Sequence, residues 1–132
     1  MKISTKGRYA LRMMIDIAEN ETKERVTIKE ISERQGISIK YLEQIVPNLT
    51  RTGLLRGVRG SGGGYMLTKN PGQYTVGAIL RAIEGKLAPV ACLDSDINYC
   101  ERSGHCKTLA FWTGLYEVID NYVDSVTLQD FL

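Results

Sequence analysis

Residues 29–67 constrain the fold of this chain more than any other segment. They read KEISERQGISIKYLEQIVPNLTRTGLLRGVRGSGGGYML. A short amphipathic helix is predicted before Gly36, which stands where a helix end favours a residue with positive φ. Ser38 is then a typical N-cap for a second helix, and a glycine-rich hairpin follows. The predicted order is helix, turn, helix and wing, which is a known way for a protein to read duplex DNA.

The second predicted helix has one apolar face and one polar face. Its apolar side chains recur at intervals of three and four residues, which directs them to the core: Leu42, Ile45, Val46 and Leu49. Its other face carries mostly hydrogen-bonding side chains: Ser38, Lys40, Tyr41, Glu43, Gln44 and Asn48. Because the first residues of a recognition helix reach base edges in the major groove, we expect DNA contacts over 38–44. Glu43 is expected to accept from cytosine N4, and a surface pair with Lys40 is the alternative.

The hairpin is predicted from two short strands, 54–59 and 65–68, around a tip of four glycines and one serine. Such a tip adopts positive φ and brings backbone N–H groups close to phosphate. Arg59 precedes the tip, where a guanidinium can enter the minor groove, and Gly60 and Ser61 begin it. A nucleotide-binding phosphate loop is the alternative, but that motif needs a helix after its glycines and a strand follows here.

Charge is divided unequally along the chain. Residues 1–71 carry 13 Lys+Arg and 7 Asp+Glu, a net charge of +6, whereas residues 72–132 carry 4 and 8, a net charge of −4. The two together give the +2 of the whole chain. The basic half contains the predicted helix-turn-helix, as expected for a nucleic-acid partner. Basic side chains near the start add predicted phosphate contacts, with Lys6 and Arg8 included in the predicted site.

The class of protein follows from length and from what the pattern excludes. A chain of 132 residues suits one domain with an appended helical element. The first 20 residues are basic and then apolar, but Arg12 and Asp16 interrupt the apolar part, so we interpret them as a core helix and not as a signal peptide. Apolar runs long enough to cross a membrane, about 18 residues, are missing, so we expect a cytoplasmic protein. One histidine and no recognisable catalytic constellation argue against an enzyme.

The pattern changes after residue 74. Thr75 is predicted to cap a short helix over 76–83 that stops at Gly85, residues 86–106 read as a loop, and a long helix is predicted from 108 to about 125. One apolar stripe of this long helix contains Leu109, Trp112, Tyr116, Ile119, Val123 and Val126. A second stripe beside it contains Phe111, Leu115, Val118 and Tyr122.

A small winged domain covers one of these stripes, so the second predicts a homodimer; the alternative is that the first helix of the same chain covers both. Symmetric dimers read palindromic sites. The predicted fold is therefore mainly α with a small β-hairpin. It comprises a winged helix-turn-helix domain over 1–74, a short helix and sensor loop over 75–106, and a dimerisation helix with a terminal turn over 107–132.

All three cysteines of the chain, Cys92, Cys100 and Cys106, fall in the predicted loop. In a cytosolic protein such a cluster indicates metal or redox chemistry more than structural disulfides. Zinc usually takes four ligands, often from closely spaced cysteine pairs, which this loop lacks. Soft thiolates at wider spacing favour an iron–sulfur cluster, and three incidental thiols are the alternative.

Several segments together resemble the Rrf2 family of bacterial transcription regulators, over nearly the whole length. They are MKISTKGRYAL, ISERQGIS with YLEQI, VRGSGGGYML, the cysteine loop and TLQDFL. The resemblance is strongest to the family's iron–sulfur cluster regulators, and a branch of cysteine-metabolism repressors without the cysteine trio is related. It implies a winged homodimer with a long crossing helix and DNA contacts from Arg59 and the helix starting at Ser38. It also implies an iron–sulfur cluster, [2Fe–2S] favoured over [4Fe–4S], on Cys92, Cys100 and Cys106.

The loop departs from that branch in two ways. The interval between the first two cysteines, seven residues, is longer than usual in the branch. Leu109 stands where the branch has a histidine ligand. The candidates for a fourth ligand are His105 and Glu101, with Asp94, Asp96 or a small thiol as further possibilities.

The expected function is a DNA-binding transcription regulator whose promoter binding is modulated by the cluster. Its expected targets are genes of iron–sulfur assembly or of cysteine and sulfur metabolism. One alternative is a cluster-free winged-helix regulator that acts through thiol chemistry or by binding a partner enzyme. Another is an iron–sulfur carrier, which the basic first half and the glycine wing disfavour.

Overall fold

Helix α1 (Thr5–Glu19) begins where Ser4 Oγ accepts a hydrogen bond from the Gly7 amide at 3.0 Å. The computed structural model describes residues 2–20 and 25–132. The helix buries one apolar face: Ala10, Met13, Met14, Ile17 and Ala18. The spacing of these side chains puts them on one side of the helix, so α1 is the core helix that the sequence predicts.

Helices α2 (Ile28–Gln35) and α3 (Ile39–Arg51) form the helix-turn-helix. Between them Gly36 takes φ 66°, the left-handed conformation that glycine adopts without steric cost. Ser38 Oγ then accepts from the Tyr41 amide at 3.1 Å and caps α3. The buried side chains of α3 are the four predicted ones: Leu42, Ile45, Val46 and Leu49.

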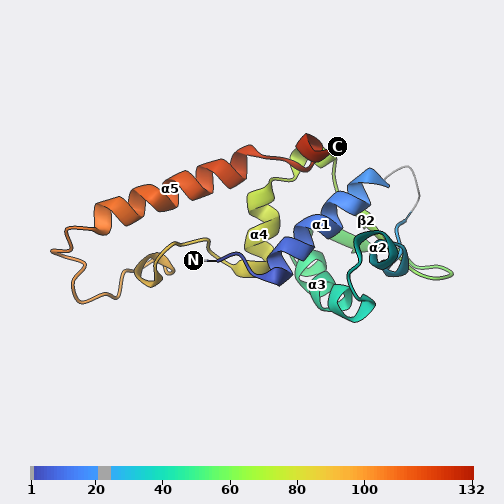
Figure 1. The fold of residues 1–132 in the computed structure, drawn as a ribbon, viewed down its shortest axis with the longest axis horizontal. Coiled ribbons are helices and arrows are strands. Elements are labelled where there is room, and N and C mark those ends of the chain that lie inside the picture. The colour runs from blue at the N-terminus through green and yellow to red at the C-terminus, as the bar shows by residue number, and fades with distance from the viewer. Residues whose placement is uncertain (1, 21–24) are drawn as a thin grey trace.

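The wing consists of strands β1 (Leu55–Gly57) and β2 (Tyr65–Leu67), paired antiparallel with Arg56 opposite Met66. Both strands are shorter than predicted. From Gly60 onward the glycines of the tip adopt positive φ, so the extended ladder cannot continue. The Val58 amide still donates to the Gly64 carbonyl at 2.9 Å. Figure 1 shows the tip of this hairpin projecting beyond the helices.

Helix α4 (Val76–Glu84) connects the winged half to the rest of the chain. Thr75 Oγ1 accepts from the Ala78 amide at 2.9 Å, and Gly85 ends the helix with φ 76°, both as predicted. A 3-10 turn, η1 (Pro71–Gln73), precedes it, followed by Tyr74, which is fully buried. The Tyr74 hydroxyl donates to the Leu54 carbonyl at 2.8 Å, which fastens the start of the wing to the core.

Helix α5 (Leu109–Ser125) differs from the others, because every residue in it is at least partly exposed. The stripe facing the body packs Ile119, Val123 and Val126 against Val76, Leu80 and Leu87. The second predicted stripe lies open to solvent, with relative exposures of 63% for Phe111, 36% for Leu115, 63% for Val118 and 69% for Tyr122. In Figure 1, α5 is a rod that extends away from the α1–α4 body.

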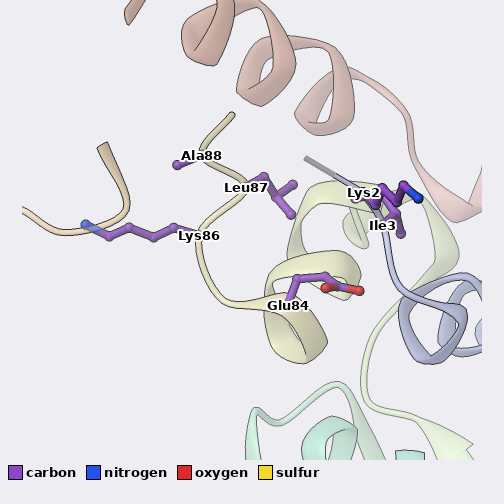
Figure 2. A pocket seen from close by; sticks show the side chains of 6 residues that line it. All are labelled: Lys2, Ile3, Glu84, Lys86, Leu87 and Ala88. Atoms are coloured by element: carbon purple, nitrogen blue, oxygen red, sulfur yellow. The ribbon is translucent and has the colours of Figure 1, made fainter. Parts of the chain in front are cut away.

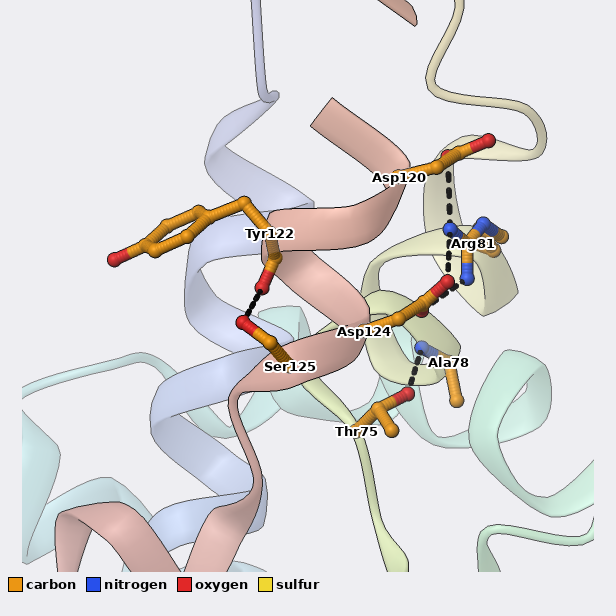
Figure 3. A network of polar contacts seen from close by, with 7 residues as sticks. All are labelled: Thr75, Ala78, Arg81, Asp120, Tyr122, Asp124 and Ser125. Atoms are coloured by element: carbon orange, nitrogen blue, oxygen red, sulfur yellow. Dashed lines mark hydrogen bonds and ion pairs between the residues drawn. The ribbon is translucent and has the colours of Figure 1, made fainter. Parts of the chain in front are cut away.

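The C-terminal end of α5 is fastened to α4 and to the core. Arg81 binds Asp120 at 2.8 Å and Asp124 at 2.7 Å (Figure 3). The hydrogen bonds that Arg81 donates to Asp124 and, to a smaller extent, to Asp120 raise the pKa of its guanidinium. Thr127 forms a β-bridge with Thr75, and the 3-10 turn η3 (Leu128–Phe131) then buries Leu128 completely in the main core.

The observed fold confirms the predicted class: mainly helical, with one two-stranded hairpin placed as a wing. The remaining element, η2 (Ala91–Leu93), is a 3-10 turn in the cysteine loop. Across residues 2–20 and 25–132, the structure contains no helix with the length and apolar content that a membrane span requires.

Candidate nucleic-acid interface and cysteine loop

The N-cap and the exposed face of α3 carry four of the ten predicted DNA contacts. Ser38, Lys40, Glu43 and Gln44 are exposed. The buried stripe on the other side of α3 fixes the direction in which they point. Among the residues that the structure describes, no ion pair joins Lys40 to Glu43, so the alternative of a surface pair is not formed.

Tyr41 and Asn48 are held more tightly than the sequence suggests. Tyr41 is half-buried and its ring packs edge-to-face on Tyr9 of α1, with centroids 5.3 Å apart. Asn48 donates to the Ala82 carbonyl of α4 at 3.1 Å and accepts from Lys6 Nζ at 3.2 Å. Asn48 therefore joins α3 to α1 and α4, and it places the Lys6 ammonium beside the recognition helix.

A buried carboxylate, Asp16, joins α1 to α2, although the sequence predicts no partner for it. Asp16 is 1% exposed, yet its two oxygens accept from Arg34 at 2.7 and 2.9 Å and from Gln35 Nε2 at 3.0 Å. The hydrogen bonds that Arg34 donates to Asp16 raise the pKa of Arg34. In the sequence, a charged residue inside an apolar helical stripe indicates such a contact, because a buried carboxylate is rarely left unpaired.

The wing presents the second group of predicted contacts. Arg59, Gly60 and Ser61 are all exposed at or beside the tip. Arg8, on the first turns of α1, is exposed and donates to Thr5 Oγ1 at 2.9 Å. Within residues 2–20 and 25–132, the ion pairs engage Arg34, Arg81 and Lys86, so the cations of the predicted interface are held by none of them.

The three cysteines lie in the segment between α4 and α5, and all are free thiols. Cys92 and Cys100 line one open hollow of about 350 Å³ together with Ala91, Ser95 and Tyr99. Cys106 lies outside that hollow, just before α5, and its sulfur is 3.3 Å from Thr108 Oγ1. The hydrogen bond from Thr108 lowers the pKa of the Cys106 thiol, which favours the thiolate.

The loop fits an iron–sulfur cluster by its donors, which are soft thiols of the kind that hold such clusters. Its arrangement gathers two of the three thiols. Across the described part of the chain, no three or more His, Cys, Asp and Glu side chains lie together in a group that could hold a metal ion. Holding a cluster on Cys92, Cys100 and Cys106 therefore requires the segment before α5 to move toward the hollow.

The candidate fourth ligands are distributed along the same loop. Glu101, His105 and Asp94 are exposed. Asp96 is already engaged in an ion pair with Lys86, and that hydrogen bond lowers the pKa of the Asp96 carboxyl. Asp96 would have to leave Lys86 in order to reach a metal.

The start of the cysteine loop meets the N-terminal segment at the end of α4. A pocket of about 90 Å³ lies there, lined by Lys2, Ile3, Glu84, Lys86, Leu87 and Ala88 (Figure 2). Glu84 accepts from the Ser4 amide at 3.0 Å and from the Ser4 hydroxyl. Because Ser4 also caps α1, the loop and the first helix of the winged half share one anchoring point.

Comparison with known proteins agrees with this geometry. The Rrf2 family profile, described as an iron-dependent transcriptional regulator, matches residues 3–132. The HTH-type transcriptional regulator IscR of Cronobacter sakazakii is 38% identical over 130 residues, 98% of this chain and 79% of that protein.

Two solved structures are similar to the whole fold. CymR, the global cysteine regulator of B. subtilis, superposes with a TM-score of 0.80 at 34% identity, covering 99% of this chain and 95% of that one. IscR of T. potens superposes with a TM-score of 0.78 at 37% identity, covering 99% and 85%. These relatives are named as regulators, in agreement with the expectation that the chain is not an enzyme. The chain belongs to the Rrf2 family of DNA-binding, winged-helix transcriptional regulators.

Proposed function

We propose that this regulator acts as a homodimer on a palindromic promoter site and that an iron–sulfur cluster on Cys92, Cys100 and Cys106 modulates its binding. In this proposal residues 1–74 bind DNA, residues 75–106 sense the cluster, and residues 107–132 hold the dimer together. The observation that carries the proposal is the open apolar stripe of α5, which directly follows the cysteine loop in the chain.

The dimer interface is proposed on α5 because its outer stripe is large, apolar and not covered by the part of its own chain that the structure describes. Phe111, Val118 and Tyr122 are each more than 60% exposed. Contiguous exposed apolar side chains on one helix are typical of a contact with another protein. A second copy of the same helix covers the stripe by symmetry, and a symmetric pair of winged domains then faces two half-sites.

The DNA contacts are proposed in two groups. The first residues of α3 enter the major groove, and the wing and α1 contact the flanking backbone and the minor groove. Glu43 lies among the base-reading residues and accepts from cytosine N4, so it selects against sites that lack a cytosine there. The proposed contact residues are Lys6, Arg8, Ser38, Lys40, Tyr41, Glu43, Gln44, Arg59, Gly60 and Ser61.

The cluster is proposed as [2Fe–2S], held by the three cysteines with His105 or Glu101 as candidates for the fourth ligand. When bound, a cluster supplies a redox-active, oxygen-sensitive group at this loop. The chain's own contribution is to present three thiols between two anchored points. Leu87 is buried with Val76 and Leu80 at one end of the loop, and α5 begins at the other.

The cluster state is proposed to act on DNA binding through these anchors. Ordering the loop biases the position of α5, and hence the separation of the two recognition helices. The family's description as iron-dependent supports an iron-responsive role, and the named cysteine regulator supports sulfur metabolism as a second target class. We therefore propose genes of iron–sulfur assembly or of cysteine and sulfur metabolism as the regulated set.

The test is anaerobic reconstitution with ferrous iron and sulfide, followed by visible absorbance and DNA-binding measurements. The parent chain is expected to develop cluster absorbance and to change its DNA affinity or its choice of site. Cys92→Ala, Cys100→Ala and Cys106→Ala are each expected to lose both responses while they retain binding to random duplex DNA. Variants that bind iron and respond like the parent would show that the three cysteines do not hold a sensing cluster.

A cluster-free regulator that acts through its thiols or through a partner enzyme is the second candidate. The specific observation in its favour is that Cys106 stands apart from the hollow shared by Cys92 and Cys100. It predicts DNA binding that is unchanged by iron and sulfide but altered by a thiol oxidant or by the partner. The same reconstitution, repeated with peroxide in place of iron and sulfide, separates the two candidates.

A further inference from the structure

Arg25, just before α2, reaches across to the tip of the wing. Its Nη2 donates to the Ser61 carbonyl. Ser61 is one of the exposed tip residues, and Arg25 itself is half-buried. Thus a side chain 36 residues earlier in the chain supplies a hydrogen bond to the part of the hairpin that extends farthest from the helices.

The residue after Arg25 continues the same attachment through the backbone. The Val26 amide donates to the Tyr65 carbonyl at 3.0 Å, and the Tyr65 amide donates back to the Val26 carbonyl at 2.9 Å. This pair is an antiparallel bridge beside β2. Because Val26 is also buried in the main core, the bridge holds the base of the wing against the core. The hydrogen bond from Arg25 holds the tip.

Two glycines of the tip leave the room that Arg25 occupies. A Cβ on Gly60 would lie 2.6 Å from Arg25 Nη1, and a Cβ on Gly64 would lie 3.0 Å from Arg25 Cβ and 3.1 Å from its Cδ. Both glycines have positive φ, 142° and 145°. Their lack of a side chain therefore serves the close approach of Arg25 as well as the turn itself.

We propose that Arg25 is a positioning residue for the wing, which holds the glycine tip in the one conformation that meets DNA. A tip of four glycines and one serine loses much conformational entropy when it is ordered against a duplex. A hydrogen bond from a charged donor to the tip carbonyl orders it before DNA arrives. The inference rests on the proposed role of the wing, and it adds a residue outside both the helix-turn-helix and the hairpin.

Arg25 also brings positive charge to the wing. The predicted cation of the hairpin tip is Arg59, which precedes Gly60. The Arg25 guanidinium, bonded at Ser61, places a second charge at the same tip. Arg25 therefore strengthens DNA binding in two ways. Its positive charge is also supplied by a lysine, whereas its hydrogen bonding depends on the forked geometry of the guanidinium.

The experiment compares Arg25→Ala and Arg25→Lys with Arg56→Ala as the matched control. Arg56 is an exposed arginine of β1 in the same hairpin, and its guanidinium contacts Met66 and not the tip. The DNA probe is a duplex that the parent protein selects from a random-sequence pool. Affinity is measured over a range of salt concentrations, and amide hydrogen exchange is measured on the protein without DNA.

Arg25→Ala is expected to bind the selected duplex about tenfold more weakly than the parent. In the free protein, its Val58 and Gly63 amides, which donate to carbonyls within the tip, are expected to exchange faster. The Tyr65 amide, bonded to Val26, is expected to exchange as in the parent. Arg25→Lys is expected to keep the salt dependence of the parent but only part of its affinity, and Arg56→Ala to leave exchange at the tip unchanged.

Two results would overturn the inference. Unchanged tip exchange in Arg25→Ala would show that the tip does not depend on Arg25. Equally faster exchange throughout the winged half would show that Arg25 serves general stability and not the wing.

A parallel Arg59→Ala variant separates this inference from the proposed DNA interface. If Arg59→Ala weakens binding while Arg25→Ala changes neither affinity nor tip exchange, only the role of Arg25 is wrong. If neither variant changes affinity although tip exchange rises in Arg25→Ala, the wing is not a DNA element, and both the proposed interface and the role of Arg25 in binding are wrong.

Discussion

The winged half of this regulator buries its apolar side chains within its own fold, whereas the long helix α5 leaves several of them exposed. From α1 to α4, apolar side chains are buried against one another. Asp16, the one charged residue that is fully buried in the described chain, has hydrogen bonds to both of its oxygens, and Glu30 Oε2 is the one buried side-chain oxygen there without a partner. In α5 one apolar stripe is half-buried and the other is open. The first region is therefore stabilised by its own packing, whereas the open stripe of α5 is available for the proposed contact with a second copy.

The polar contacts follow the same division. Around α1 and α2, Arg34 and Gln35 converge on the buried Asp16. In the cysteine loop, Lys86 binds Asp96 at the surface, with 42% of the Lys86 side chain and 95% of the Asp96 side chain exposed. Exposed pairs contribute little to stability and exchange partners easily, so the loop can rearrange at small cost while the winged half stays rigid.

The sharpest test of this contrast makes the same substitution in both regions. Leu42→Ala in α3 removes a fully buried side chain and is expected to lower the free energy of unfolding by about 2–5 kcal/mol. Leu115→Ala in α5, at the edge of the open stripe, is expected to cost less than about 0.5 kcal/mol in the monomer. Urea unfolding at low protein concentration measures both, and equal losses would remove the contrast.

The open stripe is tested next by placing a charge in it. Val118→Asp is expected to weaken association of two copies by about a hundredfold, because a desolvated carboxylate would face an apolar surface. Sedimentation velocity over a concentration series measures the shift toward monomer. The control is Glu117→Ala at the neighbouring exposed position. Association that survives Val118→Asp would mean that the stripe has another partner.

The attachment of α5 to α4 is expected to have a smaller effect. Arg81→Gln removes the ion pairs with Asp120 and Asp124, whose side chains are one-third to one-half exposed. We expect a loss of about 1 kcal/mol in the free energy of unfolding at low salt, and less at high salt. Arg102→Gln, an exposed arginine of the loop, is the control. A loss that is independent of salt would indicate packing of the Arg81 stem as the cause.

The smallest expected effect concerns the pH response of the loop. Lys86 lowers the pKa of Asp96 below its ordinary 3.8, so any stabilisation from this pair is present above that pH and lost as the pH falls through the lower, folded value. In Lys86→Met the pKa of Asp96, followed by carboxyl NMR, is expected to rise toward 3.8. An unchanged pKa would show that Asp96 does not engage Lys86 in solution.

The local features of this fold were predictable from the sequence. Gly36, Ser38 and Thr75 were assigned their turn and cap roles because the physics of a helix end involves only a few neighbouring residues. The two stripes of α5 were also predictable, because helical spacing alone sorts Val118 and Val123 onto different faces. The wing strands were overestimated, because β-propensity near Arg59 does not account for the positive φ of the glycines that follow.

The long-range polar contacts were not predictable in the same way. Asp16 with Arg34, Ser4 with Glu84, and Arg25 with Ser61 join segments that only the folded backbone brings together. Nothing in the local spacing of these residues identifies their partners. The arrangement of the cysteines has the same origin, because their spacing reveals the donor chemistry but not which thiols share a hollow.

The burial of Leu128 has a consequence for how the protein is made. This residue, in the turn that follows α5, is fully buried in the main core, where η3 contacts α1 and η1. Leu128 follows α5 in the chain, so a ribosome makes it after the winged half has already emerged. The main core therefore stays incomplete until α5 has been made and the chain turns back at Thr127. The timing of translation thus couples completion of the DNA-binding fold to completion of the helix proposed to recruit a second copy.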